Sequence, residues 1–158
     1  METSKHTIEA SINQLEQRLR EQGNEKICPV VALLKDGKLL IGLRHYTPDK
    51  WKSISVWTIP GGRCDAGEVV ETTVRRETDE ETGITDINIT SFLGEIPGVK
   101  EGDIVYVFAG TTTSDPTLRE PEKFSEWKWS EIKDIPENFI NPAALDLIRK
   151  HLTSSPSC

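Results

Sequence analysis

The chain has 158 residues and a formal net charge of −7, and its length suits one domain with a sizeable hydrophobic core. The acidic balance argues against non-specific binding to nucleic acid or to an anionic membrane. No apolar run approaches the roughly 20 residues of a membrane span, and the N-terminus lacks the apolar core of a signal peptide. Three widely spaced cysteines match neither a disulfide framework nor a zinc motif, so we expect a protein of the reducing cytoplasm.

The first predicted element is an amphipathic helix over residues 3–22, within an N-terminal segment assigned to residues 1–26. Gly23-Asn24 marks its end. Its apolar residues are spaced by four, three and four positions: Ile8, Ile12, Leu15 and Leu19. Such a helix either packs on its own domain or pairs with a second copy of the chain as a homodimer, and one short stripe leaves both readings open.

The rest of the chain predicts a mixed α/β or α+β fold, because strands surround one central helix and another helix follows at the C-terminus. The dipeptide Asp36-Gly37 is a hairpin signal between two apolar strands. Residues 153–158 are expected to form a disordered tail. The expected elements, in chain order, are strands over 28–34 and 39–44, a loop over 45–55, a strand over 56–59, a helix ending near Thr82-Gly83, strands over 87–96 and 104–109, a loop over 111–125, a strand over 126–130 and a helix over 143–152.

Four acidic residues lie within the five positions 77–81 of the central helix. Like charges three or four residues apart destabilise a helix by roughly 0.2–0.5 kcal/mol per pair, a penalty that a bound cation would reverse. The stripe that begins with Val70 and Val74 continues to Glu77 and Glu81, so this face starts apolar and ends anionic. A solvated acidic face would lie on the opposite side of the helix. Oxygen ligands of this kind suit Mg²⁺ or Mn²⁺.

The spacing around these acids resembles the Nudix box: Gly, five residues, Glu, seven residues, Arg-Glu, an aliphatic, any residue, Glu-Glu, any residue, Gly and an aliphatic. Thr78 departs from the pattern, because an aliphatic residue is usual there, whereas Ile84 fits. Seven fixed positions matched over 23 residues make the resemblance specific. The positions are Gly62, Glu68, Arg76, Glu77, Glu80, Glu81 and Gly83. The resemblance implies a mixed sheet sandwiched between helices over residues 27–152, with the N-terminal helix outside the common core.

The resemblance also implies the metal ligands: Glu77, Glu80 and Glu81, with the backbone carbonyl of Gly61 or Gly62 as an additional ligand. Glu77 is in addition a candidate general base, although in some relatives the base lies on a later loop. For that loop we expect Glu122 to supply the carboxylate, with Glu120 as the second choice; the alternative for either residue is a solvated acidic loop.

Other box residues are expected to support the ligands. Arg76 would orient the carboxylates through charge-assisted bonds, and Glu68 would stabilise the loop and the same network. Gly61 and Gly62 permit a tight turn after a strand, and Gly83 suits a left-handed helix cap.

Three residues outside the box are candidates for substrate binding. Arg44 ends a strand where similar enzymes place an arginine near substrate phosphates; its alternative is a surface arginine. Asn141 lies in a segment, Phe139-Ile140-Asn141-Pro142, that resembles one in which relatives read a purine edge; its alternative is a helix N-cap. Trp57 would stack on a base or lie partly in the core.

The implied activity is metal-dependent hydrolysis of a nucleoside diphosphate linked to another group, in which water attacks a phosphoanhydride bond. We predict a nucleoside triphosphate pyrophosphohydrolase that releases a monophosphate and pyrophosphate. The alternative within this class is an ADP-ribose or nucleotide-sugar pyrophosphatase. The alternative from another class is a non-catalytic nucleotide-binding regulatory module, but such a module usually loses a ligand glutamate and none is lost here.

Overall fold

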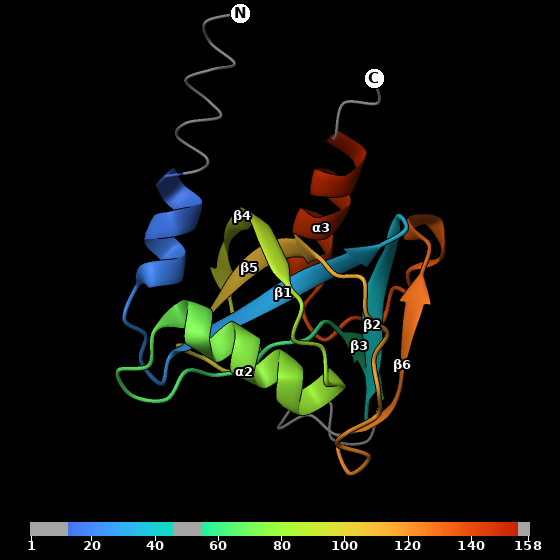
Figure 1. The fold of residues 1–158 in the computed structure, drawn as a ribbon, viewed down its shortest axis with the longest axis horizontal. Helices are drawn as coiled ribbons and strands as arrows, with labels where there is room; N and C mark the ends of the chain where they lie inside the picture. The colour runs from blue at the N-terminus through green and yellow to red at the C-terminus, as the bar shows by residue number, and fades with distance from the viewer. Residues whose placement is uncertain (1–12, 46–54, 155–158) are drawn as a thin grey trace, which may run out of the picture.

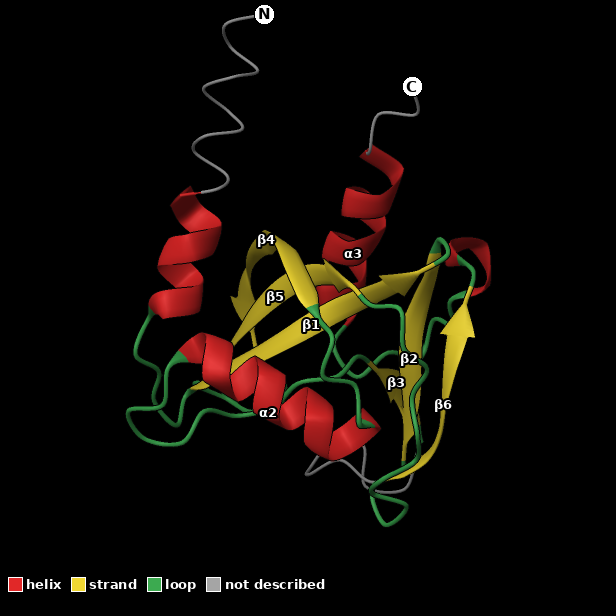
Figure 2. Cartoon of the chain, in the orientation of Figure 1, coloured by secondary structure: helices red, strands yellow, loops and turns green. Residues whose placement is uncertain are grey.

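The structure, a computed structural model, describes residues 13–45 and 55–154. Its centre is a six-stranded mixed sheet with helix α2 (Val70–Thr82) on one face and helix α3 (Pro142–Ser154) on the other, as Figures 1 and 2 show. This arrangement confirms the predicted fold class. The strands are β1 (Ile27–Lys35), β2 (Lys38–Arg44), β3 (Val56–Thr58), β4 (Asn88–Pro97), β5 (Ile104–Thr111) and β6 (Phe124–Ser130), and a 3-10 turn, η2 (Ile132–Asp134), follows β6.

The sheet runs in the order β3-β2-β1-β5-β4, and β6 pairs with β2. Strands β1 and β5 are parallel, from the pair Ile27–Ile104 to the pair Leu34–Thr111, whereas the other pairings are antiparallel. β1 and β2 pair beside the predicted hairpin, where Asp36 and Gly37 have φ of 52° and 77°. Positive φ at two central residues is typical of the type I′ turn, which confirms the hairpin signal.

Side-chain alternation along β1 and β5 divides the hydrophobic core into two layers. Leu33 and Phe108 point to the α2 side, where they pack with the buried Val70 and Val74. The intervening residues point to the α3 side, where Ala32 and Val107 share a cluster with Leu145 and Ile148. The predicted stripe of Val70 and Val74 and the apolar face of α3 therefore both pack against the sheet.

The N-terminal helix is described over residues 13–20, so it ends before the predicted stop at Gly23-Asn24. Its Leu15 and Leu19 pack against the core layer under α2, as expected if the helix packs on its own domain. Ile8 and Ile12 of the predicted stripe lie outside the described residues. Pairing with a second copy stays a prediction.

Strand and helix boundaries differ from the sequence-based expectation by one or two residues, as β6 and α3 illustrate. β6 begins at Phe124, within the loop predicted over 111–125. α3 continues through Thr153 and Ser154, which we had assigned to a disordered tail. The hydroxyl of Thr153 donates to the Arg149 carbonyl one turn back, so this polar side chain is accommodated within the last turn. The other tail residues and most of the loop predicted over 45–55 lie outside the described residues.

Across residues 13–45 and 55–154, no helix combines the length and the apolar character needed to cross a membrane.

Candidate active site

The turn that follows β3 brings the backbone of the box loop against β1. The N–H of Gly62 donates to the carbonyl of Pro29 at 3.1 Å. A Cβ on Gly61, whose φ is 146°, would lie 2.4 Å from the same carbonyl oxygen. A Cβ on Gly62 would lie 2.5 Å from Cδ of Glu77. Both glycines are therefore needed for close approach to neighbouring groups, in addition to the tight turn that the sequence predicted.

Helix α2 ends as predicted at Gly83, which has φ of 75° and donates its N–H to the carbonyl of Asp79 at 2.8 Å. Thr78, the residue that departs from the family pattern, is fully buried. Its hydroxyl donates to the Val74 carbonyl at 2.7 Å, so the polar group is paired inside the helix. Thr78 can therefore replace an aliphatic residue here, because its buried hydroxyl has a hydrogen-bond partner.

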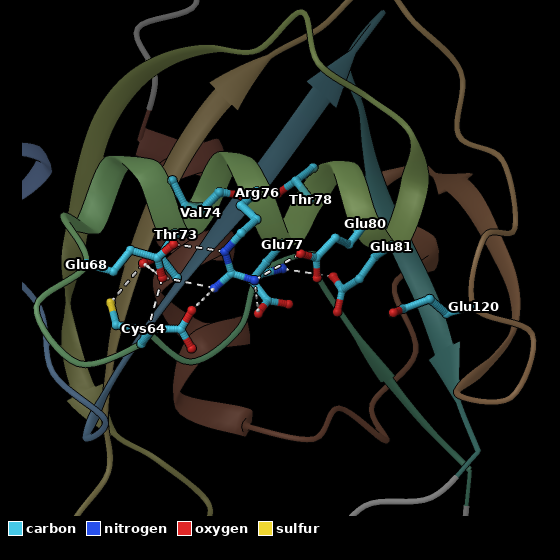
Figure 3. Close-up of polar contacts among 12 residues, drawn as sticks. Cys64, Glu68, Thr73, Val74, Arg76, Glu77, Thr78, Glu80, Glu81 and Glu120 are labelled. Carbon is cyan, nitrogen blue, oxygen red and sulfur yellow. Dashed lines mark hydrogen bonds and ion pairs between the residues drawn. The ribbon is translucent and has the colours of Figure 1, made fainter.

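Arg76 lies at the centre of the acidic residues (Figure 3). Its Nε and Nη2 donate to the two carboxylate oxygens of Glu68 at 2.8 and 2.9 Å, a bidentate pair. Its Nη1 donates to Glu77 at 3.1 Å and to Glu80 at 3.0 Å. One guanidinium thus connects an acid of the box loop to two acids of the helix, an arrangement suited to the orienting role that we predicted for Arg76.

Glu68 connects the box loop to α2 through further contacts. Its carboxylate accepts hydrogen bonds from the Thr73 hydroxyl at 2.7 Å and from the Asp65 N–H at 3.1 Å. The bonds from Arg76, together with that from Thr73, lower the pKa of Glu68 to about 2, although its burial acts in the opposite direction. Glu68 is therefore held as an anion, as its predicted supporting role requires.

Glu81 is the most deeply placed acid of the cluster, with 5% of its surface exposed. Burial raises the pKa of its carboxyl to about 8, the N–H of Gly61 that donates to it at 3.1 Å opposes this shift, and the negative charges of Glu77 and Glu120 add to it. Burial likewise raises the pKa of Glu77, against the effect of Arg76. Buried carboxylates of this kind are stabilised as anions by a nearby cation.

The donor set fits a hard divalent cation by its chemistry. Glu77 and Glu81 offer carboxylate oxygens in the wall of a cavity that Gly61 and Gly62 also border, and Glu80 offers a further carboxylate at a more exposed position beside Arg76. In the side-chain positions seen in residues 13–45 and 55–154, no three His, Cys, Asp or Glu residues converge as a metal-binding group. In these positions the Arg76 guanidinium donates to both Glu77 and Glu80. Oxygen donors suit Mg²⁺ and Mn²⁺.

A cavity of about 350 Å³ opens beside the acids, with Glu77 and Glu81 in its wall. Its lining also contains a third acid, Asp103, together with cationic residues and a set of apolar residues. The cations are Arg44, Arg63, Lys100 and Lys123. The apolar residues include Val30, Ile59, Val99, Val105, Phe124, Phe139, Ile140 and Ala144. A ligand that carries both anionic groups and a flat or apolar group would match this lining.

The predicted phosphate-binding residue Arg44 lines the cavity. The carbon of its guanidinium lies 5.7 Å from the ring centroid of Phe124, and its charge opposes the raised pKa of Glu81. Arg44 is therefore placed where a substrate phosphate could meet it.

For the carboxylate of the later loop, the geometry favours Glu120, the second choice, over Glu122. Neither Glu120 nor Glu122 lines the cavity, but Glu122 is exposed, whereas Glu120 is half-buried, affects the pKa of Glu81 and points towards it in Figure 3. Glu120 also pairs with Lys123, which lines the cavity, at 3.5 Å. The second choice, Glu120, therefore lies nearer to the acidic cluster.

Trp57 does not have the position expected of a base-stacking residue. It is 8% exposed, belongs to the core layer under α3, and is not part of the cavity lining. The ammonium of Lys128 covers one face of its ring at 4.6 Å from the centroid. The alternative, a core position, is the correct one.

Asn141 borders the cavity but uses its amide at both ends. Its Oδ1 accepts the N–H of Ala143 at 3.2 Å, and its Nδ2 donates to the carbonyl of Pro97 at 2.9 Å. The first contact is a helix N-cap for α3, which was the alternative to purine recognition. The predicted contact of this amide with a base would compete with both bonds.

The cavity wall also contains an ion pair between Arg63 and Asp103, which the sequence did not predict. Arg63 donates in bidentate fashion to Asp103, at 2.8 and 2.6 Å, and also to the carbonyl of Glu25 at 2.6 Å. This pairing lowers the pKa of Asp103, which is 8% exposed. Arg63 occupies a variable position of the box and Asp103 ends a turn, so no sequence pattern singles out either residue.

The site thus has the groups of a metal-dependent phosphohydrolase: clustered carboxylates, cations and a mixed cavity. The NUDIX domain matches residues 27–151, and the chain belongs to the Nudix family of hydrolases. The RNA pyrophosphohydrolase of Caulobacter vibrioides is 28% identical over 131 residues, which cover 70% of this chain and 74% of that protein. The NAD-capped RNA hydrolase NudC of Photobacterium profundum is 30% identical over 111 residues, which cover 69% of this chain and 39% of that protein.

Solved structures share the fold. A MutT Nudix hydrolase from Burkholderia pseudomallei superposes with a TM-score of 0.64 at 24% identity, covering 78% of this chain and 97% of its own. At this level of identity the likeness concerns the fold alone.

Because the pKa of Glu68 is lowered in the folded chain, we expect the free energy of unfolding to depend on pH. Because its pKa in the folded chain lies below the ordinary 4.5, its ionised form stabilises the fold above about pH 4.5, and this contribution is lost as the pH falls towards 2. We expect the difference in unfolding free energy between wild type and Glu68→Gln, measured with urea, to be constant above about pH 5 and to shrink below it. A difference that does not vary with pH would contradict the assigned ion pair.

Asn141→Ala should act on the helix cap. We expect a loss of about 1 kcal/mol in unfolding free energy, with kcat/KM reduced equally for purine and pyrimidine substrates. Thermal unfolding and steady-state rates with a matched purine and pyrimidine pair measure both quantities. A selective loss of purine turnover would instead support base recognition by the amide.

Proposed function

We propose that this protein is a metal-dependent nucleoside triphosphate pyrophosphohydrolase that releases a monophosphate and pyrophosphate. The observation that carries the proposal is the placement of Glu77 and Glu81 in the wall of a cavity that also holds cations and apolar side chains. Nudix hydrolases generally use Mg²⁺ or Mn²⁺. A divalent ion would offset the burial of Glu81, and a triphosphate would meet the cations of the same cavity.

The metal would be held by Glu77, Glu80 and Glu81, with the carbonyl of Gly61 or Gly62 as a further ligand. When bound, such ions neutralise phosphate oxygens and lower the pKa of coordinated water. Arg76 would keep two of the acids oriented, because its guanidinium already contacts Glu77 and Glu80. Arg76 in turn is fixed by the bidentate bonds to the carboxylate of Glu68.

The remaining chemistry is positioning and proton transfer. Arg44 and Lys123 line the cavity near the acids and would contact phosphate oxygens, which positions the chain of phosphates for in-line attack. Glu77 is one candidate for accepting the proton of the attacking water, and Glu120, from the later loop, is the other. The apolar residues of the cavity, among them Val105 and Phe139, would hold the base.

Two other substrate classes compete with triphosphates. ADP-ribose or a nucleotide sugar also combines a diphosphate with a base. The terminal phosphates of RNA are a third class, because one relative is named an RNA pyrophosphohydrolase and another an NAD-capped RNA hydrolase. The expectation that the partners exclude nucleic acid therefore stays a prediction. A cytoplasmic location is proposed on the basis of the thiols of Cys28 and Cys64, which are both free.

A turnover screen with Mg²⁺ and with Mn²⁺ tests the proposal. The panel contains canonical and oxidised nucleoside triphosphates, ADP-ribose, nucleotide sugars, dinucleoside polyphosphates and a short RNA with a 5′-triphosphate, with products identified by mass. Monophosphate and pyrophosphate from a triphosphate is the expected result. Cleavage of diphosphate-linked substrates or RNA ends alone would overturn the triphosphate assignment, and binding of metal without any turnover would favour a regulatory module.

Glu81→Gln should reduce kcat by about 100-fold or more while the chain stays folded, because the variant removes a predicted metal ligand. Glu120→Gln should also lower kcat, whereas Glu122→Gln, a matched change at an exposed position of the same loop, should not. Rates are compared at saturating metal, with circular dichroism as the folding control. Near wild-type turnover of Glu81→Gln would rule out the proposed ligand set.

A further inference from the structure

The segment before β1 contacts the box loop directly, although it lies outside the matched residues 27–151. We call residues 13–23 the N-terminal strap. The N–H of Gly23 donates to the carbonyl of Glu68 at 2.7 Å, and the N–H of Gly67 donates to the carbonyl of Gly23 at 3.1 Å. The N–H of Val70 donates to the carbonyl of Glu21 at 2.9 Å. The strap thus pairs with the backbone on both sides of Glu68, close to where α2 begins (Figure 1).

These contacts satisfy groups that the box itself leaves open. Val70 is the first residue of α2, and the preceding Val69 provides no side-chain cap. The first N–H groups of a helix have no partner within the helix, so the carbonyl of Glu21 serves as an external cap. The loop that carries Glu68 and the start of the helix that carries Arg76 are therefore held by the same three strap residues, 21–23.

Packing at Gly23 is too close for any side chain. A Cβ at this position would lie 2.5 Å from Sγ of Cys64 and 2.9 Å from the carbonyl oxygen of Glu68. Cys64 is itself buried, and its sulfur lies 3.2 Å from the hydroxyl oxygen of Thr73, which donates its hydrogen to Glu68. A shift of the strap at Gly23 would therefore displace the neighbours of the Glu68 carboxylate.

The strap is anchored to the sheet by Arg18. The carbon of its guanidinium lies 5.2 Å from the ring centroid of Phe92 and 5.0 Å from that of Tyr106, which are cation–π distances. It also pairs with Glu95 at 3.3 Å, and the hydroxyl of Tyr106 donates to Glu21. The anchor thus fixes the residue whose carbonyl caps α2.

We propose that the N-terminal strap is a positioning element of the hydrolytic site, in which Arg18 and Gly23 hold the box loop so that Glu68 aligns Arg76 with the metal-binding acids. Arg18 and Gly23 are positioning residues, because they act through Glu68 and do not line the cavity. The inference rests on the proposed function of this site. A segment that only adds stability would change the free energy of unfolding but not the turnover of the folded protein.

The first test compares Arg18→Ala with Arg20→Ala in the full chain. Both changes remove one positive charge from the same helix, but Arg20 has 80% of its side chain exposed and pairs with Glu16. For Arg18→Ala we expect faster amide hydrogen exchange at residues 67–70, and kcat lower by about tenfold with KM unchanged, because small displacements of catalytic groups are costly. Arg20→Ala should match wild type in both measurements.

A second variant separates positioning from stability. Gly23→Ala should lower kcat in the same way, whereas Leu152→Ala, which removes a partly buried side chain far along α3, should lower the melting temperature without changing kcat in the folded protein. Wild-type kcat in both Arg18→Ala and Gly23→Ala, or unchanged exchange at residues 67–70, would overturn the proposal.

Failure of the proposed function remains distinguishable from failure of the strap. If wild type hydrolyses no substrate of the panel, the Mn²⁺ affinity of each variant is measured instead. Weaker Mn²⁺ binding in Arg18→Ala and Gly23→Ala, with wild-type binding in Arg20→Ala and Leu152→Ala, would support positioning. Equal Mn²⁺ affinity in all four variants, or no Mn²⁺ binding by wild type, would overturn it.

Discussion

The guanidinium of Arg76 is the interaction on which the site depends. Three acids would otherwise repel one another, because Glu77 and Glu80 come from one turn of helix and Glu68 faces them from the loop. Arg76 offers donors in a fixed planar fork, so it sets the directions of these carboxylates as well as balancing their charge. Glu81 lies beyond its reach in a buried position, which leaves one acid of the cluster without that compensation.

The distribution of charge in the cavity differs from that of the whole chain. The chain is acidic overall, yet four cations border the cavity together with three acids; the cations are Arg44, Arg63, Lys100 and Lys123. Local fields of this kind decide which ligand is attracted, whereas net charge describes non-specific association. The acidic composition was therefore a sound reason to doubt non-specific binding of nucleic acid, but it carries no information about a single anionic group that enters this cavity.

Sequence reasoning succeeded where the signal was local. The stripe of Val70 and Val74, the cap at Gly83 and the turn at Asp36-Gly37 each depend on neighbours within one turn, so spacing and residue type were sufficient. The box spacing likewise located the acids. The sequence could not decide between Glu120 and Glu122, because an irregular loop has no period that separates the two positions.

Contacts between distant segments were missed for a similar reason. Arg63 and Asp103 meet across the cavity wall, and Gly23 meets Glu68 through backbone groups that every residue type possesses. Trp57 was assigned by its chemistry, which allows stacking, but its strand turns the ring into the core. Local sequence patterns do not predict contacts between residues far apart in the chain, so these contacts are recognised only in the folded structure.

The parallel pairing of β1 with β5 has a consequence for how the chain acquires its structure. Roughly half of the chain lies between Ile27 and its partner Ile104, including the whole box and α2. Closing so long a loop loses conformational entropy before the sheet contacts can compensate, so early compact states would lack the central strand pair. During synthesis, the layer under α2 cannot be completed until β5, which supplies Tyr106 and Phe108, has left the ribosome.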